Sequence, residues 1–128
     1  MAMSVLQVVG SAYRATVEDE GDRAVRLIAA LKQAGADLAI LLRGNAVNYA
    51  VHGQDPSGLC IGGRTLARPP RVADDLTQLL AGAVDVYVVV EDAADRGLLR
   101  RFLIDGIKPV KKAELATLFD KYDQVWHW

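Results

Sequence analysis

The sequence predicts an α/β fold: a three-layer α/β/α sandwich built on a mainly parallel sheet of about five strands. Short apolar runs alternate along the chain with segments of helical spacing, which is typical of a parallel sheet covered on both faces. The run Val84–Val90 (VDVYVVV) is continuous and rich in β-branched residues, so we expect it to be the central strand. The 128 residues suit one domain, 1–128, with a single core.

The first half of the chain is expected to supply two buried strands and two helices. Each strand is a short, mostly apolar run, and the first helix shows apolar residues at helical spacing with a glycine after its end. In order, the elements are a strand Ser4–Val9, a helix from Asp22 to Gly35, a strand Asp37–Leu42, and a short helix through Ala50 with Asn45 as its N-cap. Gly53–Pro70 is rich in glycine, proline and serine and is expected to be a long loop.

The second half continues the alternation of helices and strands. Leucines at helical spacing, β-branched runs and a final aromatic run carry these predictions. In order, the elements are a helix Val72–Gly82, the strand Val84–Val90, a partly helical segment Asp92–Phe102, a short strand Gly106–Val110, a helix Lys112–Tyr122 and a last strand Gln124–Trp128.

Composition and charge argue against several classes of function. A hydrophobic content of 52% indicates a globular chain and not a disordered one. The formal net charge of −1 provides no basic field, so neither nucleic acid nor a membrane is expected as a partner. The apolar runs are too short to span a bilayer, and the first residues lack the basic region of a signal peptide. We therefore expect a reduced, cytoplasmic protein.

Neither metal nor cofactor binding has a motif in the sequence. One cysteine and two histidines form no zinc pattern, and the acids from Glu18 to Asp22 suit a helix start better than a metal site. The stretch Ser57–Arg64 (SGLCIGGR) lacks the spacing and the Lys-Ser/Thr ending of a phosphate-binding loop. Lys108-Pro109 is similar to the lysine–proline pair of receiver domains, but the acidic pair after the first strand is missing. No metal and no cofactor are therefore expected.

Cys60 is the candidate catalytic residue. A cysteine becomes reactive when nearby positive charge stabilises its thiolate, and Arg64 could supply that charge. Pairing with His52 as a base is conceivable, although such pairs in a sequence are mostly coincidence. The alternative is a glycine-rich loop in which the cysteine has no chemical role.

A candidate binding site lies where the parallel strands end. Ligand sites in such sheets lie at the carboxyl ends of the strands. Polar side chains follow three of these ends: Ser11, Tyr13, Arg43, Asn45, Glu91 and Asp92. They could bind a small ligand, or they could serve only as turn residues and helix caps.

Four stretches of the chain resemble the DsrE/DsrF/DsrH-like family of sulfur-relay proteins, which includes the Tus subunits of tRNA thiolation. They are the strand, turn and Arg-Gly of VYVVVEDAADRGLL, the second strand and its continuation in DLAILLRGNAVNYAV, the first strand followed by Gly10-Ser11-Ala12-Tyr13, and the ending KYDQVWHW. The resemblance implies a homo-oligomer, a trimer or a hexamer, and other sulfur-relay proteins as partners.

The chain departs from the family's sulfur carriers at one position. Their acceptor cysteine ends the central strand, where this sequence has Val89 and Val90, neither of which can hold a persulfide. Glu91-Asp92 and the tryptophan-containing terminus are similar to the DsrH/TusB-type subunits, which lie beside the carrier. The resemblance therefore implies a non-carrier binding or assembly subunit.

Three hypotheses remain open, and whether the protein is an enzyme is undecided among them. The first is the non-carrier subunit, with aromatic and apolar residues near the terminus in its oligomer interface: Tyr122, Val125, Trp126 and Trp128. The second is a sulfurtransferase-like enzyme that uses Cys60. The third is a module that binds a small ligand at the strand ends.

Overall fold

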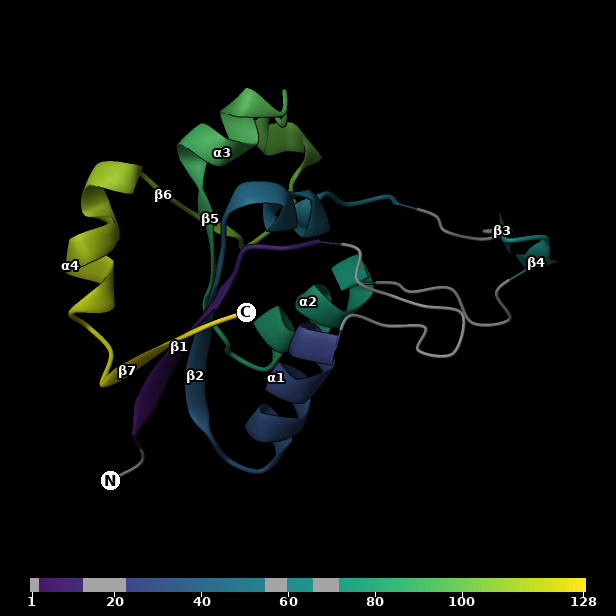
Figure 1. Ribbon diagram of the computed structural model, residues 1–128. Helices are drawn as coiled ribbons and strands as arrows, with labels where there is room; N and C mark the ends of the chain where they lie inside the picture. The colour runs from purple at the N-terminus through teal and green to yellow at the C-terminus, as the bar shows by residue number, and fades with distance from the viewer. Residues whose placement is uncertain (1–2, 13–22, 55–59, 66–71) are drawn as a thin grey trace.

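A parallel sheet of five strands forms the centre of the computed structural model, which describes residues 3–12, 23–54, 60–65 and 72–128 (Figure 1). The strand order is β6-β5-β2-β1-β7, and every neighbouring pair is parallel. The strands are β1 (Ser4–Val9), β2 (Asp37–Leu42), β5 (Val86–Val89), β6 (Lys108–Val110) and β7 (Gln124–His127).

Helices cover both faces of the sheet, so the predicted three-layer α/β/α sandwich is confirmed. Figure 1 shows α1 (Arg23–Gln33) and α2 (Val72–Ala81) on one side of the strands and α4 (Leu115–Phe119) on the other. The short helix α3 (Val90–Asp95) follows β5 directly and stands over the strand ends. None of the helices in the described part of the chain combines the length and apolarity of a membrane span.

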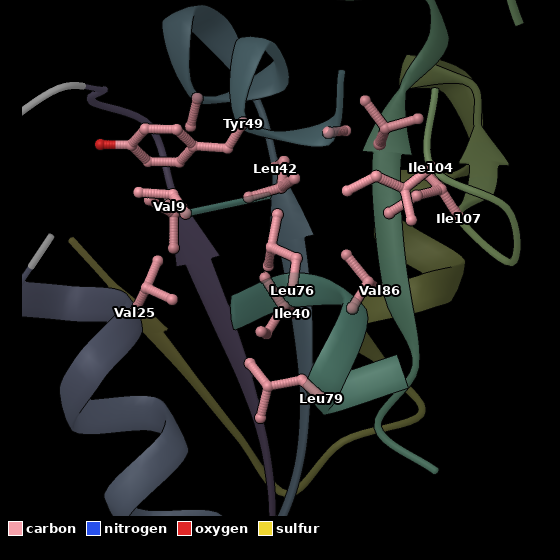
Figure 2. Close-up of a cluster of buried hydrophobic side chains, with 14 of the residues drawn as sticks. Val9, Val25, Ile40, Leu42, Tyr49, Leu76, Leu79, Val86, Ile104 and Ile107 are labelled. Atoms are coloured by element: carbon pink, nitrogen blue, oxygen red, sulfur yellow. The ribbon is translucent and has the colours of Figure 1, made fainter. Parts of the chain in front are cut away.

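Alternation along β2 explains how one strand serves two cores. Ile40 and Leu42 belong to the buried cluster under α1 and α2, and Leu41 belongs to the cluster under α4. Figure 2 shows the first cluster, in which side chains from β1, β2 and β5 meet those of the two helices. Positions buried on both faces of a strand are apolar, which is why β2 is a continuous apolar run after the exposed Asp37.

The expectation that Val84–Val90 forms the central strand is wrong in the position and in the bounds of the strand. The strand itself is β5, it lies between β2 and β6, and β2 occupies the middle of the sheet. An unbroken apolar run reports burial on both faces, and this burial is shared by every interior strand. Val90 begins α3 instead of ending the strand.

Asn45 is not the N-cap of the short helix that was expected to run through Ala50. The segment is a 3-10 helix, η1 (Gly44–Ala50), so Asn45 lies inside it. Arg43 is at the cap position and makes no capping bond with its side chain. The N–H of Gly44, the first residue of η1, has no partner within the helix and donates to the carboxylate of Asp92.

Two other segments also differ from expectation. The described part of the Gly53–Pro70 loop holds a hairpin, β3 (Cys60–Ile61) and β4 (Arg64–Thr65), around Gly62 and Gly63 with φ of 59° and 78°. A two-residue turn with both φ positive is the hairpin turn that glycine favours. The expected helix Lys112–Tyr122 is divided into η3 (Lys112–Glu114) and α4 and ends at Phe119. The partly helical segment expected after β5 consists of α3 and η2 (Arg100–Phe102).

Candidate functional site

Five residues at the carboxyl ends of the strands form a connected polar group, here called the strand-end cluster: Gly44, Asn45, Asp92, Arg96 and Lys112. Asp92 Oδ2 accepts the Gly44 N–H at 2.7 Å, and Lys112 Nζ lies 3.4 Å from Asp92 Oδ1. Arg96 donates to Asn45 Oδ1 at 2.8 Å and to the Asp92 carbonyl at 3.0 Å. Loops after β2, β5 and β6 are therefore held together through Asp92.

The charge on Asp92 is stabilised by its surroundings. Its side chain is only 13% exposed, and this burial by itself would raise the pKa of the carboxyl. The Gly44 hydrogen bond, the Lys112 ammonium and the Arg96 guanidinium together outweigh burial and hold the Asp92 pKa below its ordinary value. Asp92 is thus an ionised carboxylate with its hydrogen-bonding capacity largely used inside the fold.

Glu91 has a similar role on the neighbouring loop. Its two carboxylate oxygens accept the backbone N–H of Lys112 at 3.1 and 3.2 Å. This contact joins the start of α3 to the start of η3. Both acids of the Glu91-Asp92 turn therefore bind backbone groups of other loops.

The structure brings several of the predicted binding residues to one edge of the sheet. Asn45 and Asp92 share Arg96 as a hydrogen-bond partner, while Arg43 and Ser11 are exposed beside them at the ends of β2 and β1. Tyr13 lies outside the described residues. Three cluster members were missed from the sequence: Gly44, Arg96 and Lys112. Their roles depend on a backbone N–H and on contacts between loops, which no local motif marks.

Close approach of the chain explains why residue 44 is glycine. Its φ is +56°, a conformation that a side chain makes costly, and a Cβ there would lie 3.2 Å from the Gly10 carbonyl oxygen. A glycine at position 44 therefore lets the loops after β1 and β2 pass each other directly. This contact sets the position of the Gly44 N–H under Asp92.

Cys60 does not belong to this cluster. Its thiol is free and exposed on the β3–β4 hairpin, which Figure 1 shows beyond α2 and well to the side of α3. His52, the base considered for it, places Nε2 2.9 Å from the Arg101 carbonyl oxygen. At the position expected for a carrier thiol, Val89 is buried and Val90 is 37% exposed at the start of α3.

A cavity of about 660 Å³ lies beside α3, and the sequence did not reveal it. Its walls come from α3, from the segment 98–107 and from Pro109 of β6. Most of the lining is apolar, including Val90, Leu98 and Leu99, with Arg100, Arg101 and Asp105 among the polar residues. None of the predicted binding residues lines it.

The segment Asp92–Phe102, expected to be partly helical, leaves the helix at this cavity. The helix ends at Asp95, and Gly97 with φ of 68° turns the chain away. Leu98 and Leu99 lie on the stretch between α3 and η2. On this stretch Leu99 is 52% exposed at the cavity wall.

Comparison with known proteins identifies structural relatives. No family model matches the chain, and no curated protein matches it by sequence. The crystal structure of the ychN protein from E. coli is similar over 100% of both chains, with 26% sequence identity and a TM-score of 0.74. A protein of unknown function from Methanobacterium thermoautotrophicum, MTH1491, is similar over 98% of this chain and 99% of its own, with 13% identity and a TM-score of 0.59. The chain shares the fold of both.

Proposed function

We propose that this protein acts in intracellular sulfur transfer as a non-carrier binding or assembly subunit of the DsrE/DsrF/DsrH-like type. One observation carries the non-carrier part. The acceptor position at the end of β5 holds Val89, which is 1% exposed, followed by a second valine. A persulfide needs a thiol, and the chain's one thiol lies elsewhere, on the β3–β4 hairpin.

The fold supports the family assignment. The four stretches that resemble the DsrE-like proteins fall on β1, β2, β5 with α3, and β7, which are four of the five strands of the central sheet. The full-length likeness to the ychN protein agrees with a common architecture over the whole chain.

The state of the Glu91-Asp92 turn supports a structural role for this end of the sheet. Both carboxylates accept backbone N–H groups, from Lys112 and from Gly44. Groups engaged in this way stiffen the surface over the strand ends and are not free to act on a substrate. A stiff surface suits the binding of a partner protein.

Intact mass measurement after incubation with a cysteine desulfurase and free cysteine tests the proposal. We expect no change in the mass of the wild-type chain on incubation. The Cys60→Ser variant should likewise show no change. A species one sulfur atom heavier, absent from Cys60→Ser, would overturn the non-carrier assignment and favour a sulfurtransferase-like enzyme that uses Cys60.

A DsrE-type carrier with its acceptor cysteine, added to the same mixture, tests the link to sulfur transfer. The carrier also shows that the desulfurase is active. If the protein takes part in sulfur transfer from the desulfurase to the carrier, its presence should change the amount of persulfide that the carrier holds. An unchanged amount at every ratio of the two proteins would contradict the proposed function.

The cavity beside α3 supports a second candidate, a module that binds a small ligand. Its volume lies within the range of about 300 to 1,000 Å³ that is typical of small-molecule sites. An apolar wall with arginines nearby suits a ligand that combines an apolar body with an anionic group.

Binding of the anionic apolar dye 8-anilinonaphthalene-1-sulfonate should report this cavity. Leu99→Asp is expected to weaken dye binding about tenfold, because it removes an apolar contact and adds a repelling charge. Leu27→Asp is the matched control, since Leu27 is similarly exposed at 43% but lies on α1. Equal dye affinity for the two variants, measured by fluorescence titration, would argue against the cavity as the site.

A further inference from the structure

The outer edge of β7 carries backbone groups that have no partner among the described residues. Trp128 faces β1 with both of its backbone groups: its N–H donates to Val8 at 2.8 Å and its carbonyl accepts from Gly10 at 3.3 Å. Successive residues of a strand in a parallel sheet face opposite neighbours. The N–H and C=O groups of Val125 and His127 therefore point away from β1, along the open edge.

The two edges of the sheet differ in their protection. On β6, Pro109 has no N–H to offer, and Lys108 is exposed and charged, both of which discourage strand pairing. On β7 the residues are Gln124, Val125, Trp126 and His127, with no proline and no lysine. The β7 edge thus lacks the features that keep another strand from adding to it.

Trp126 of β7 and Trp128, directly after the strand, lie two residues apart and therefore face the same side of the sheet. Trp126 is 40% and Trp128 is 36% exposed, although each indole N–H already donates within the fold, to Gln124 Oε1 and to Gln7 Oε1. What the rings leave exposed is therefore mainly apolar surface. Such rings contribute strongly when they are buried at an interface.

We propose that β7 pairs antiparallel with β7 of a second copy of this chain across a two-fold axis. The axis passes beside Trp126, so that Val125 of one copy lies opposite His127 of the other. Each of these two pairs exchanges two backbone hydrogen bonds, which satisfies the open groups of both edges. The pairing joins two five-stranded sheets into one of ten strands.

The edge is suited to a copy of itself for two reasons. Val125 and His127 are placed symmetrically about Trp126, so the same edge supplies donors and acceptors in matching register. The four residues of β7 carry no formal charge at neutral pH with histidine neutral, so no like charges meet across the axis. The two tryptophans at residue 126 become cross-strand neighbours, a close aromatic pair.

This inference rests on the homo-oligomeric part of the proposed function and on nothing else in it. A two-fold contact builds a dimer, or joins two trimers into a hexamer, but it has no place in an isolated trimer. The pairing of the two β7 strands does not depend on a role in sulfur transfer.

Sedimentation velocity over a wide range of protein concentration tests the pairing, with His127→Pro and His127→Ala as a matched pair. Proline removes only an outward N–H, while alanine keeps it. Because each substitution acts twice across the axis, His127→Pro should raise the dissociation constant of the pair about 30-fold, and His127→Ala should leave it nearly unchanged. Trp126→Lys, which opposes two charges at the axis, is a second variant in case the proline variant does not fold.

A wild-type chain that does not associate at any concentration would overturn the pairing, as would association that Trp126→Lys and a folded His127→Pro leave unchanged. The desulfurase and carrier measurement on the same samples separates the two proposals. If the wild-type protein stays monomeric but still changes the amount of persulfide on the carrier, only the pairing is refuted. Paired wild-type chains without any effect on the carrier would refute the proposed function alone.

Discussion

Replacing Leu42 with alanine is expected to lower the free energy of unfolding by about 2 to 5 kcal/mol, the usual cost of removing a buried leucine side chain. Leu42 is fully buried at the end of β2, the middle strand of the sheet. In Figure 2 it lies among the side chains that fill the space between the sheet and α2. The packed sheet below it cannot close over the void, because β2 is fixed by hydrogen bonds to β1 and β5.

Urea unfolding followed by circular dichroism measures this loss, and Leu27→Ala is its matched control. The chemical change is the same, but Leu27 is 43% exposed on α1, so its loss should cost about 1 kcal/mol or less. Similar losses for the two variants would mean that the space beneath α2 is not packed as Figure 2 shows.

The strands could be predicted because their burial leaves a direct mark on the sequence. β1 and β2 have the predicted bounds, Ser4–Val9 and Asp37–Leu42, since a strand covered on both faces is mostly apolar. The one buried polar side chain of β1, Gln7, accepts a hydrogen bond from the Trp128 indole. The order of the strands leaves no such mark. Interior strands look alike in a sequence, and therefore β2 could not be distinguished from β5 as the middle one.

The helix after β5 could not be bounded from local spacing. Ala93, Leu98, Leu99 and Phe102 match an apolar helix face, yet the chain leaves the helix at Asp95 and turns at Gly97. Tertiary contacts decide this outcome, because residues 103 and 104 pair with Val51 and with Ala50 at the end of η1. The cavity beside α3 follows from that pairing and was invisible for the same reason.

The location of the candidate site, at the carboxyl ends of the strands, could be predicted from the sequence. The hydrogen bonds within the site could not. Parallel strands bring their carboxyl ends to one edge, so Asn45 and Asp92 were expected near each other. Their link runs through Arg96, and the main partner of Asp92 is the N–H of Gly44, 48 residues earlier. A backbone donor has no sequence signature, so this hydrogen bond could only be found in the structure.

Asp92→Asn is expected to lower the free energy of unfolding by about 1 to 2 kcal/mol at pH 7, the difference between charge-assisted and neutral hydrogen bonds at this site. The amide keeps the size of the side chain and an acceptor oxygen for the Gly44 N–H. It loses the charge that attracts Lys112, whose Nζ lies 3.4 Å away. Asp95→Asn, on the same helix but exposed and with no hydrogen-bond partner among the described residues, should change stability by about 0.5 kcal/mol or less.

The pH dependence of this difference identifies its cause. Folding lowers the Asp92 pKa from its ordinary value of 3.8, so the carboxylate stabilises the fold fully above that value. As the pH falls below 3.8 and through the lowered pKa, the folded protein also takes up the proton and the contribution is lost. The gap in unfolding free energy between wild type and Asp92→Asn should therefore be constant near neutrality and shrink in acid. A gap of the same size at acidic and neutral pH would show that Asp92 acts through shape and hydrogen bonding alone, and that its charge does not hold the loops together.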